Sequence, residues 1–492
     1  MKHLQLIILF LLMSQLAGAQ NFLNKDDLPE SFYKHMEGKI VREYPKENAI
    51  NELSVTMNMR RRGDAISGTY FYQSDTLSLS LNGYIMNEGV YQFEAVDPDF
   101  NVKGNFRGKF RDSTTLEGRL MVPRGSKKET WLFTLKETYE KNVDFKVYQF
   151  HDKHYINDNP DYPYIDFKVD FLYPKRYKDS QILNKIQVLV EKEFFGKYAM
   201  QQKPMANIKK KRNEAFAEYK QYVEQNYQYN PDNVQYYIWK SEYVADVIYN
   251  SDNILTIKIK SQEIVGGEAQ FGGVNYLVVD LTKGEPIRLE DIFKEGYNKA
   301  LATVITEKIK EDYDIKANYE LMESNFLVDM IEPNENYYID RKGIGFYFSP
   351  YAINEFEVRV YISYRDLGEI LKKQSPISKF FPKDMDFGNM QHLVQAREEM
   401  LELYKTIQQQ QMPDPNSSNV QYPQSSESEG ESGGVVYPGE EGGGNESGGV
   451  TYPGEEGGGN ESGGVTYPGE EGGGNESGGV TYPGEEGGGN ES

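Results

Sequence analysis

Two histidines lie close together in the segment His151-Asp152-Lys153-His154, the one place where this chain clusters imidazoles. On a helix, an i,i+3 pair can direct two ligands at one zinc ion, which would still need a third ligand. The aromatic residues on both sides and the nearby Pro160 are instead typical of a strand end or a loop. We therefore expect a solvated loop here, with no bound metal and no other cofactor.

Carboxylates are the second residue type that could do chemistry. Glu263 and Glu268 flank the pair Gly266-Gly267, and Asp280 lies near the end of the following strand-like run. Two carboxylates facing one another across a cleft are the machinery of glycoside hydrolysis. The sequence does not place such a pair in space, so a glycan hydrolase that uses paired Asp and Glu stays open as an alternative function.

The glycine pair opens a stretch, residues 266–273, that ends in a second glycine pair. A phosphate-binding loop would need Gly-Lys-Ser/Thr at the start of a helix, and a dinucleotide fingerprint would also lead into a helix. Here Gly272-Gly273 leads into Val274-Asn275-Tyr276, which predicts a strand. We expect an exposed loop between two strands, where small residues let a partner approach. Cysteine is absent from the chain, which excludes a cysteine nucleophile, and no catalytic residue is assigned.

The first twenty residues predict export. Lys2 supplies a positive charge, residues 6–13 form an apolar core, and residues 17–19 (Ala-Gly-Ala) match a cleavage site. The apolar run is too short to span a bilayer, which takes roughly twenty residues. We expect residues 1–19 to be a signal peptide, and the mature protein to be periplasmic or extracellular without a membrane span.

The acidic charge is concentrated at the C-terminal end. Removing Lys2 takes the net charge from −22 to −23, and −15 of this lies from residue 425 onward, which leaves about −8 for residues 20–424. Nothing in this balance favours a nucleic-acid partner, which requires a basic face.

Four copies of a fifteen-residue unit fill residues 432–491, the first SGGVVYPGEEGGGNE and the others SGGVTYPGEEGGGNE. Such a unit is too poor in apolar side chains to offset the entropy lost on ordering. We expect residues 413–492 to be a disordered, self-repelling tail. A structural surface protein displayed through this tail is a second alternative function.

Residues 20–140 are predicted to form an all-β domain. Apolar and polar residues alternate, for example at Val55, Met57 and Met59, and turn signals such as Asn82-Gly83 recur at short intervals. We expect about seven antiparallel strands that form a meander or a small barrel. For a domain of this size, a lumen filled by side chains is favoured over a ligand cavity.

Strands and helices interleave over residues 141–373, which predicts an α+β domain. The expected strands are residues 164–173, 236–249, 254–264, 274–281, 343–348 and 357–362. The expected helices are residues 180–194, 209–222, 298–310 and 364–371. Residues 374–412 are expected to form a linker and an amphipathic helix, either docked on this domain or paired in a coiled coil.

A family resemblance rests on Ile287–Phe293 (IRLEDIF), Gly345–Ile353 (GFYFSPYAI) and Val358–Tyr364 (VRVYISY), in that order behind the glycine stretch. Residues 143–373 resemble the ectodomain of RsiV-type anti-sigma factors, also found in PdaC-type peptidoglycan deacetylases. The resemblance implies a non-catalytic envelope domain, which in the RsiV type recognises lysozyme. The family's glycine loop usually continues through an alanine–histidine pair, which is absent from residues 266–272 here.

The leading hypothesis is an exported, non-catalytic binding protein whose partner is a lysozyme-like hydrolase or peptidoglycan. Aromatic residues dominate binding hot spots. We therefore expect the contacts to come from the glycine-rich stretch and nearby rings: Gly266, Gly267, Glu268, Phe271, Gly272, Tyr276, Tyr347 and Tyr351.

Overall fold

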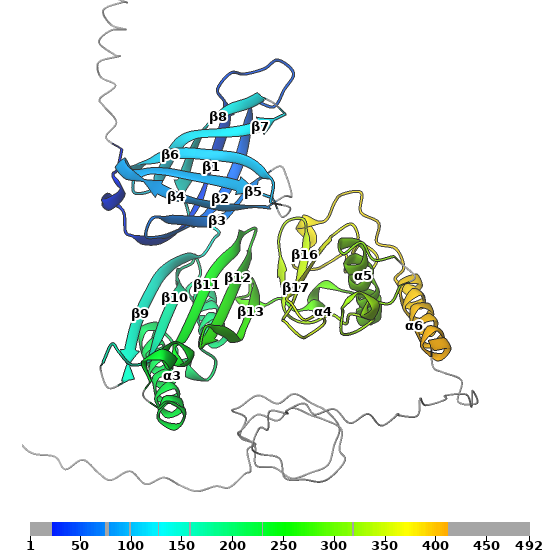
Figure 1. Ribbon diagram of the computed structural model, residues 1–492. Coiled ribbons are helices and arrows are strands. Elements are labelled where there is room, and N and C mark those ends of the chain that lie inside the picture. Colours follow the sequence, from blue (N-terminus) through cyan, green and yellow to red (C-terminus); the bar gives the residue numbers. More distant parts are fainter. Residues whose placement is uncertain are drawn as a thin grey trace, which may run out of the picture. The chain divides into compact units, whose positions relative to one another are not determined.

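The computed structural model describes residues 22–411, except 74–77, 98–99, 126, 157–158, 229 and 317–318; the side chains of residues 268–271 and 407–411 are also not described. The predicted signal peptide and the predicted disordered tail lie outside these residues. The described part is α+β, as the sequence predicts: an N-terminal β-barrel, two further sheets and a few helices (Figure 1).

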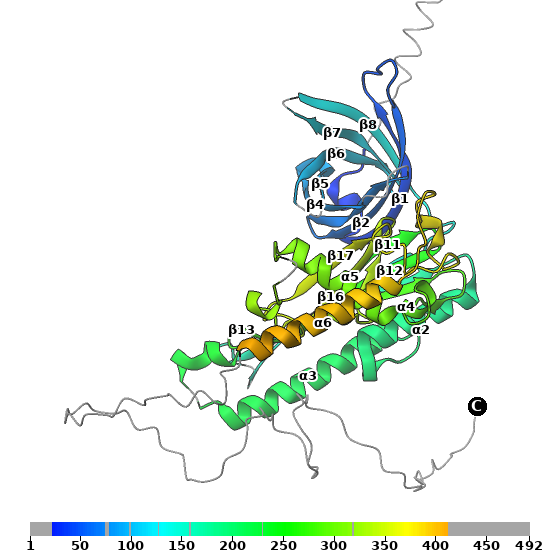
Figure 2. The ribbon, with the colours of Figure 1, turned by 90° about the vertical axis from the view of Figure 1, so that its right-hand side faces the viewer.

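The N-terminal barrel is closed and antiparallel, with eight strands in sequence order (Figure 2). Its closure comes from β1, which pairs with β2 on one side and with β8 on the other. The strands are β1 (Ser31–Arg42), β2 (Glu52–Arg62), β3 (Ala65–Tyr72), β4 (Ser78–Met86), β5 (Val90–Val96), β6 (Val102–Asp112), β7 (Thr115–Arg124) and β8 (Lys127–Glu137).

Side chains fill the inside of the barrel. Phe106 is the centre of an aromatic cluster, with ring centroids 5.0 Å from Tyr70, 5.0 Å from Phe93 and 5.4 Å from Phe133. These rings and the methionines Met57 and Met59 are buried almost completely. An eight-stranded barrel is just wide enough for side chains to fill, which explains this packing.

A six-stranded sheet follows, in the order β14-β13-β12-β11-β10-β9. Its strands are β9 (Asp144–Tyr155), β10 (Tyr164–Arg176), β11 (Trp239–Ser251), β12 (Ile254–Val265), β13 (Glu268–Asp280) and β14 (Glu285–Pro286). Only β10 and β11 are parallel, and the crossover between them carries the helices α2 (Ser180–Phe195) and α3 (Pro204–Asn226). Asp179 caps α2, because its carboxylate accepts the N–H groups of Gln181 and Ile182.

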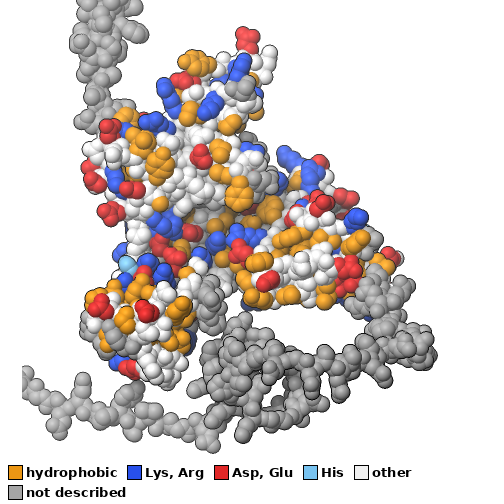
Figure 3. All heavy atoms as spheres, in the orientation of Figure 1, with side chains coloured by type: hydrophobic (Ala, Val, Ile, Leu, Met, Phe, Trp, Pro, Cys, Tyr) orange, Lys and Arg blue, Asp and Glu red, His pale blue; other side chains and the backbone are white. Residues whose placement is uncertain are grey.

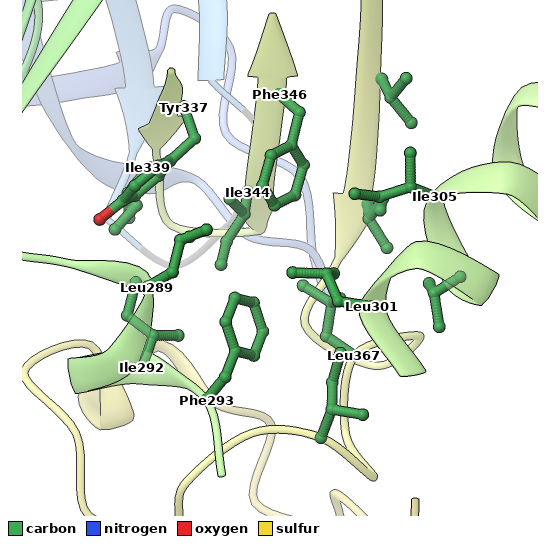
Figure 4. Close-up of a cluster of buried hydrophobic side chains, with 14 of the residues drawn as sticks. Leu289, Ile292, Phe293, Leu301, Ile305, Tyr337, Ile339, Ile344, Phe346 and Leu367 are labelled. Atoms are coloured by element: carbon green, nitrogen blue, oxygen red, sulfur yellow. The ribbon is translucent and has the colours of Figure 1, made fainter. Parts of the chain in front are cut away.

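A smaller three-stranded sheet, β15 (Tyr337–Ile339), β16 (Gly343–Phe348) and β17 (Val358–Ser363), packs with α4 (Leu289–Ile292) and α5 (Tyr297–Asp312). Figure 4 shows its core, in which Phe293 and Leu301 point towards Ile344 and Phe346. The helix α6 (Gln391–Gln411) lies against α5, where the Thr303 hydroxyl donates to the carbonyl of Leu393 at 2.9 Å.

The predicted helix over residues 364–371 is wrong. These residues form successive turns, and Leu371 makes an isolated bridge with Phe293. The carbonyl of Ile370 accepts the N–H of Lys294, and the N–H of Lys372 donates to Ile292. Backbone groups that a continuing helix would need are thus bonded to a distant segment, and this tertiary pairing overrides the local helical pattern.

Candidate functional site

The first glycine pair forms a tight hairpin turn between β12 and β13. Gly266 and Gly267 have φ angles of 60° and 89°, and Val265 pairs with Glu268 across them. Positive φ at both central residues is what a primed two-residue hairpin requires. A Cβ on Gly266 would lie 2.7 Å from the carbonyl oxygen of Tyr236, whereas a Cβ on Gly267 would meet nothing.

The predicted exposed loop over residues 266–273 is therefore wrong in its extent. Only the first pair is a turn, while Gly272 and Gly273 lie within β13, opposite Gln262 and Ser261. Since φ at this second pair is not positive, its backbone can join the ladder with β12. Glu268 and Phe271 also belong to β13, but their side chains lie outside the described part.

The structure brings together two of the predicted contact residues, Tyr276 and Tyr347, whose ring centroids are 6.4 Å apart. Tyr351 does not join them: it is 72% exposed, has a φ of 64° and lies in the turn between β16 and β17. Tyr347 is only 2% exposed, and its hydroxyl donates to Glu357 at 2.8 Å. Tyr347 is thus mainly a core residue.

Tyr276 belongs to a tyrosine cluster, which we define as Tyr276, Tyr338, Tyr347 and Tyr361. Its rings come from β13, β15, β16 and β17, with centroids 4.9 Å apart for Tyr276 and Tyr338 and 6.2 Å for Tyr338 and Tyr361. Asn336 joins the two sheets here, because its side chain accepts the N–H of Tyr276 and donates to the Val274 carbonyl. The cluster is therefore held in place by backbone pairing and by these bonds.

Basic residues flank the tyrosine cluster. Lys258 on β12 lies directly opposite Tyr276 in the β12–β13 register, and residues in register project to the same face. Lys260 lies two residues further along the strand, hence also on that face. The Arg359 guanidinium on β17 lies 5.8 Å from the ring centre of Tyr347. Figure 3 shows blue and red side chains side by side in the region of β11 and β12.

The acidic residues around Lys258 already have partners. Asp246 lies opposite Lys258 in the β11–β12 register, but its carboxylate is bound by Arg62. Glu357 accepts from Arg359 at 2.6 Å and from the Tyr347 hydroxyl at 2.8 Å. These contacts leave the nearby carboxylates engaged with other groups.

Lys258 itself is left without a partner. Its ammonium makes no hydrogen bond or ion pair with any residue that the structure describes, although the side chain is half-buried. Burial lowers the pKa of Lys258, the positive charge of Arg359 lowers it further, and Asp246 acts in the opposite direction. A half-buried cation without a counter-ion, next to an aromatic wall, is a candidate position for an anionic ligand.

The paired-carboxylate arrangement that the sequence leaves open does not form from Glu263 and Asp280. Glu263 lies near the hairpin turn and accepts the Tyr243 hydroxyl at 2.7 Å. Asp280 lies opposite Ile254 at the other end of the hairpin and caps the following turn through Thr282. Nine residues of strand separate Ile254 from Glu263, roughly 30 Å. The two carboxylates are too far apart to act on one glycosidic bond.

The two histidines lie at the C-terminal end of the strand β9, so the strand end that their surroundings indicate is correct and the solvated loop is not. His151 contacts Asp166 at 2.6 Å, and the ring of His154 stacks on Phe216 with centroids 5.2 Å apart. Residues three apart on a strand project to opposite faces, so the two imidazoles do not share a site. Within the described residues, no three His, Cys, Asp or Glu side chains converge as a metal site requires.

A separate hollow of about 350 Å³ lies at the C-terminal end of α5 and contains none of the predicted contact residues. It is lined by Tyr313, Asp314, Ile315, Lys316, Tyr319 and Ser324.

Sequence reasoning missed Lys258 and Arg359. The signal was present in the alternation of the predicted strand 254–264, which places Lys258 and Lys260 on one face. Their importance depends on which carboxylates are bound elsewhere, and this is visible only in the folded chain.

Residues 290–354 match a family described as a protein of unknown function, DUF3298. A solved DUF3298 family member from Bacteroides fragilis is 23% identical, covers 49% of this chain and 99% of its own, and has a TM-score of 0.45. A second, from Pseudomonas aeruginosa, is 13% identical, covers 48% and 97%, and has a TM-score of 0.34. No curated protein matches the chain.

Among the described residues, no helix combines the length and apolar character that crossing a membrane requires.

Proposed function

We propose that this chain is an exported, non-catalytic binding protein of the bacterial envelope, which recognises peptidoglycan or a lysozyme-like hydrolase that acts on it. The observation that carries the proposal is the unpaired ammonium of Lys258 beside the tyrosine cluster. Binding sites commonly combine aromatic walls with a small number of placed polar groups, and this surface has both.

Export is supported by the N-terminal sequence, with its positive charge, its apolar core and its small-residue cleavage site. A non-catalytic role is supported by the chemistry of the surface. Its carboxylate Glu357 is bonded to Arg359 and Tyr347, so it is not poised to take or give a proton to a ligand. The resemblance to RsiV-type ectodomains supports an envelope partner.

The test is titration calorimetry of residues 20–492 against a panel of lysozymes and against soluble peptidoglycan fragments, with the fragments analysed afterwards by mass spectrometry. We expect saturable heat and unchanged fragments. Cleaved fragments would favour a hydrolase instead. Absence of binding to both kinds of partner would contradict the proposal.

A further inference from the structure

We infer that Lys258 and Arg359 hold a carboxylate of the ligand while the ring that carries it packs against Tyr276 and Tyr338. This inference rests on the proposed function and names the ligand chemistry of the same surface: an acidic sugar, of which muramic acid in peptidoglycan is the obvious example.

The charge around Lys258 fits an anionic ligand. Asp246 is held by Arg62, and Glu357 is held by Arg359, so these neighbouring carboxylates are already compensated. Two ammonium groups, those of Lys258 and Lys260, lie here without a carboxylate partner among the described residues, and that of Lys260 donates to the Gln262 side chain. A ligand carboxylate would supply the missing negative charge.

Arg359 has the geometry to share such a ligand. One of its terminal nitrogens donates to Glu357 at 2.6 Å, and half of the side chain is exposed. A guanidinium carries five N–H donors in a planar fork, so donors remain for a second carboxylate. Lys258 and Arg359 approach the surface from different sheets, β12 and β17, joined here by Asn336.

The tyrosines favour a ligand that carries a ring next to its carboxylate. Tyr276 is opposite Lys258 in register, and Tyr338 lies 4.9 Å from Tyr276 between ring centroids. Tyr276 and Tyr338 are both half-buried residues. A pyranose has C–H faces that can cover aromatic surface, while its acidic substituent reaches the ammonium.

An unpaired, half-buried ammonium is a cost to the folded chain. A purely structural lysine would lie with its stem on apolar surface and its ammonium in water, or would pair with Asp246 opposite. The pairing with Asp246 does not form, because Arg62 binds that carboxylate, and the half-buried Lys258 has its pKa lowered by burial and by Arg359. An anionic ligand would remove this cost, since it restores a counter-ion at the ammonium.

The experiment compares two probes that differ by one acidic group. N-acetylmuramic acid carries a lactyl carboxylate that N-acetylglucosamine lacks, and each is titrated into residues 20–492. We expect the muramic acid to bind at least about tenfold more tightly, the effect of one charge-assisted contact. Binding at alkaline pH should also be accompanied by proton uptake, measured in buffers of different ionisation enthalpy, because a counter-ion raises the lowered pKa of Lys258.

Three variants make the assignment specific. Lys258→Met keeps the length of the side chain and should abolish both the preference and the proton uptake. Lys258→Arg should retain most of the preference. Lys128→Met, at an exposed position of β8, should behave as the unmodified protein.

The outcomes separate the two proposals. Equal binding of both sugars, or a preference that survives in Lys258→Met, would overturn the inference, whereas binding of larger peptidoglycan fragments or lysozyme would still support the proposed function. Absence of binding to all of these partners would overturn both.

Discussion

The side-chain amide of Asn250 donates to the hydroxyl of Tyr33 at 3.0 Å and so joins the six-stranded sheet to the barrel. Asn250 is completely buried, and it also bonds to both backbone groups of Val143, the N–H at 3.0 Å and the carbonyl at 2.8 Å. The Asn250 side chain thus supplies hydrogen-bond partners to Val143, which lies in the segment between the barrel and the six-stranded sheet.

Replacement of Asn250 by Ala should destabilise the protein by about 2–4 kcal/mol, because two backbone groups of Val143 and the Tyr33 hydroxyl lose a buried partner. The measurement is the midpoint of urea unfolding, which should fall. Asn82→Ala, at an exposed position of β4, is the matched control and should leave the midpoint almost unchanged. A fall of equal size in both variants would contradict this account.

Asp170 binds Arg60 and Arg62 at the same junction, and Arg62 extends the network to Asp246. The Arg60 side chain is 3% exposed, so Asp170→Asn would leave a buried cation without its counter-ion. We expect a loss of about 3 kcal/mol in the free energy of unfolding, measured by chemical denaturation. Asp384→Asn removes a carboxylate from the exposed pair with Arg365 and should have hardly any effect.

The two glycines of the β12–β13 turn should respond differently to a methyl group. Gly267→Ala should cost about 1 kcal/mol, the ordinary strain of a left-handed backbone. Gly266→Ala should cost clearly more, because its methyl group also meets the Tyr236 carbonyl at 2.7 Å. Thermal unfolding of the two variants side by side gives the comparison. Equal melting temperatures would show that the close approach to Tyr236 is unimportant.

Lys258→Met should stabilise the unliganded protein at neutral pH by about 0.5–1 kcal/mol, because it removes an unpaired charge from a surface where function is favoured over stability. The folded-state pKa of Lys258 lies below its ordinary value of 10.5. The cost of the buried charge is therefore fully present below the folded pKa, and it disappears as the pH rises through 10.5. The difference in unfolding free energy between the variant and the unmodified protein, measured at pH 7 and at pH 10, should shrink at the higher pH. A constant difference would mean that the ammonium is solvated.

Local periodicity was sufficient to predict much of the fold. The strands β10, β12 and β16 and the helices α2 and α5 come from clear alternation or helical spacing, and the structure places them where that spacing predicts. About seven barrel strands were expected and the structure has eight, and β1 is the hardest to recognise because residues 32–36 are all buried. One face of β1 lines the barrel while Tyr33 packs with the sheet, and a strand buried on both faces shows no alternation.

The candidate site was harder to predict for a related reason. Tyr276 and Tyr347 could be named as aromatic candidates, but their proximity depends on how the β15–β17 sheet packs against β13. The isolation of Lys258 depends on Arg62, a barrel residue far away in the sequence, which binds the carboxylate opposite it. A pattern within one segment holds no information on either point.

The pairing of β1 with β8 also constrains the order in which the chain can fold. Gly38 is opposite Leu135, so the barrel cannot close until the ribosome has released the chain as far as β8, which ends at Glu137. Until then β1 has a free edge, and Tyr33 lacks its partner Asn250, which is synthesised later still. Contacts between such distant residues are slow to form. One edge of β1 can pair with β2 early, but its other edge must stay open until β8 has been made, and a helper protein that covers strand edges would be most useful during that interval.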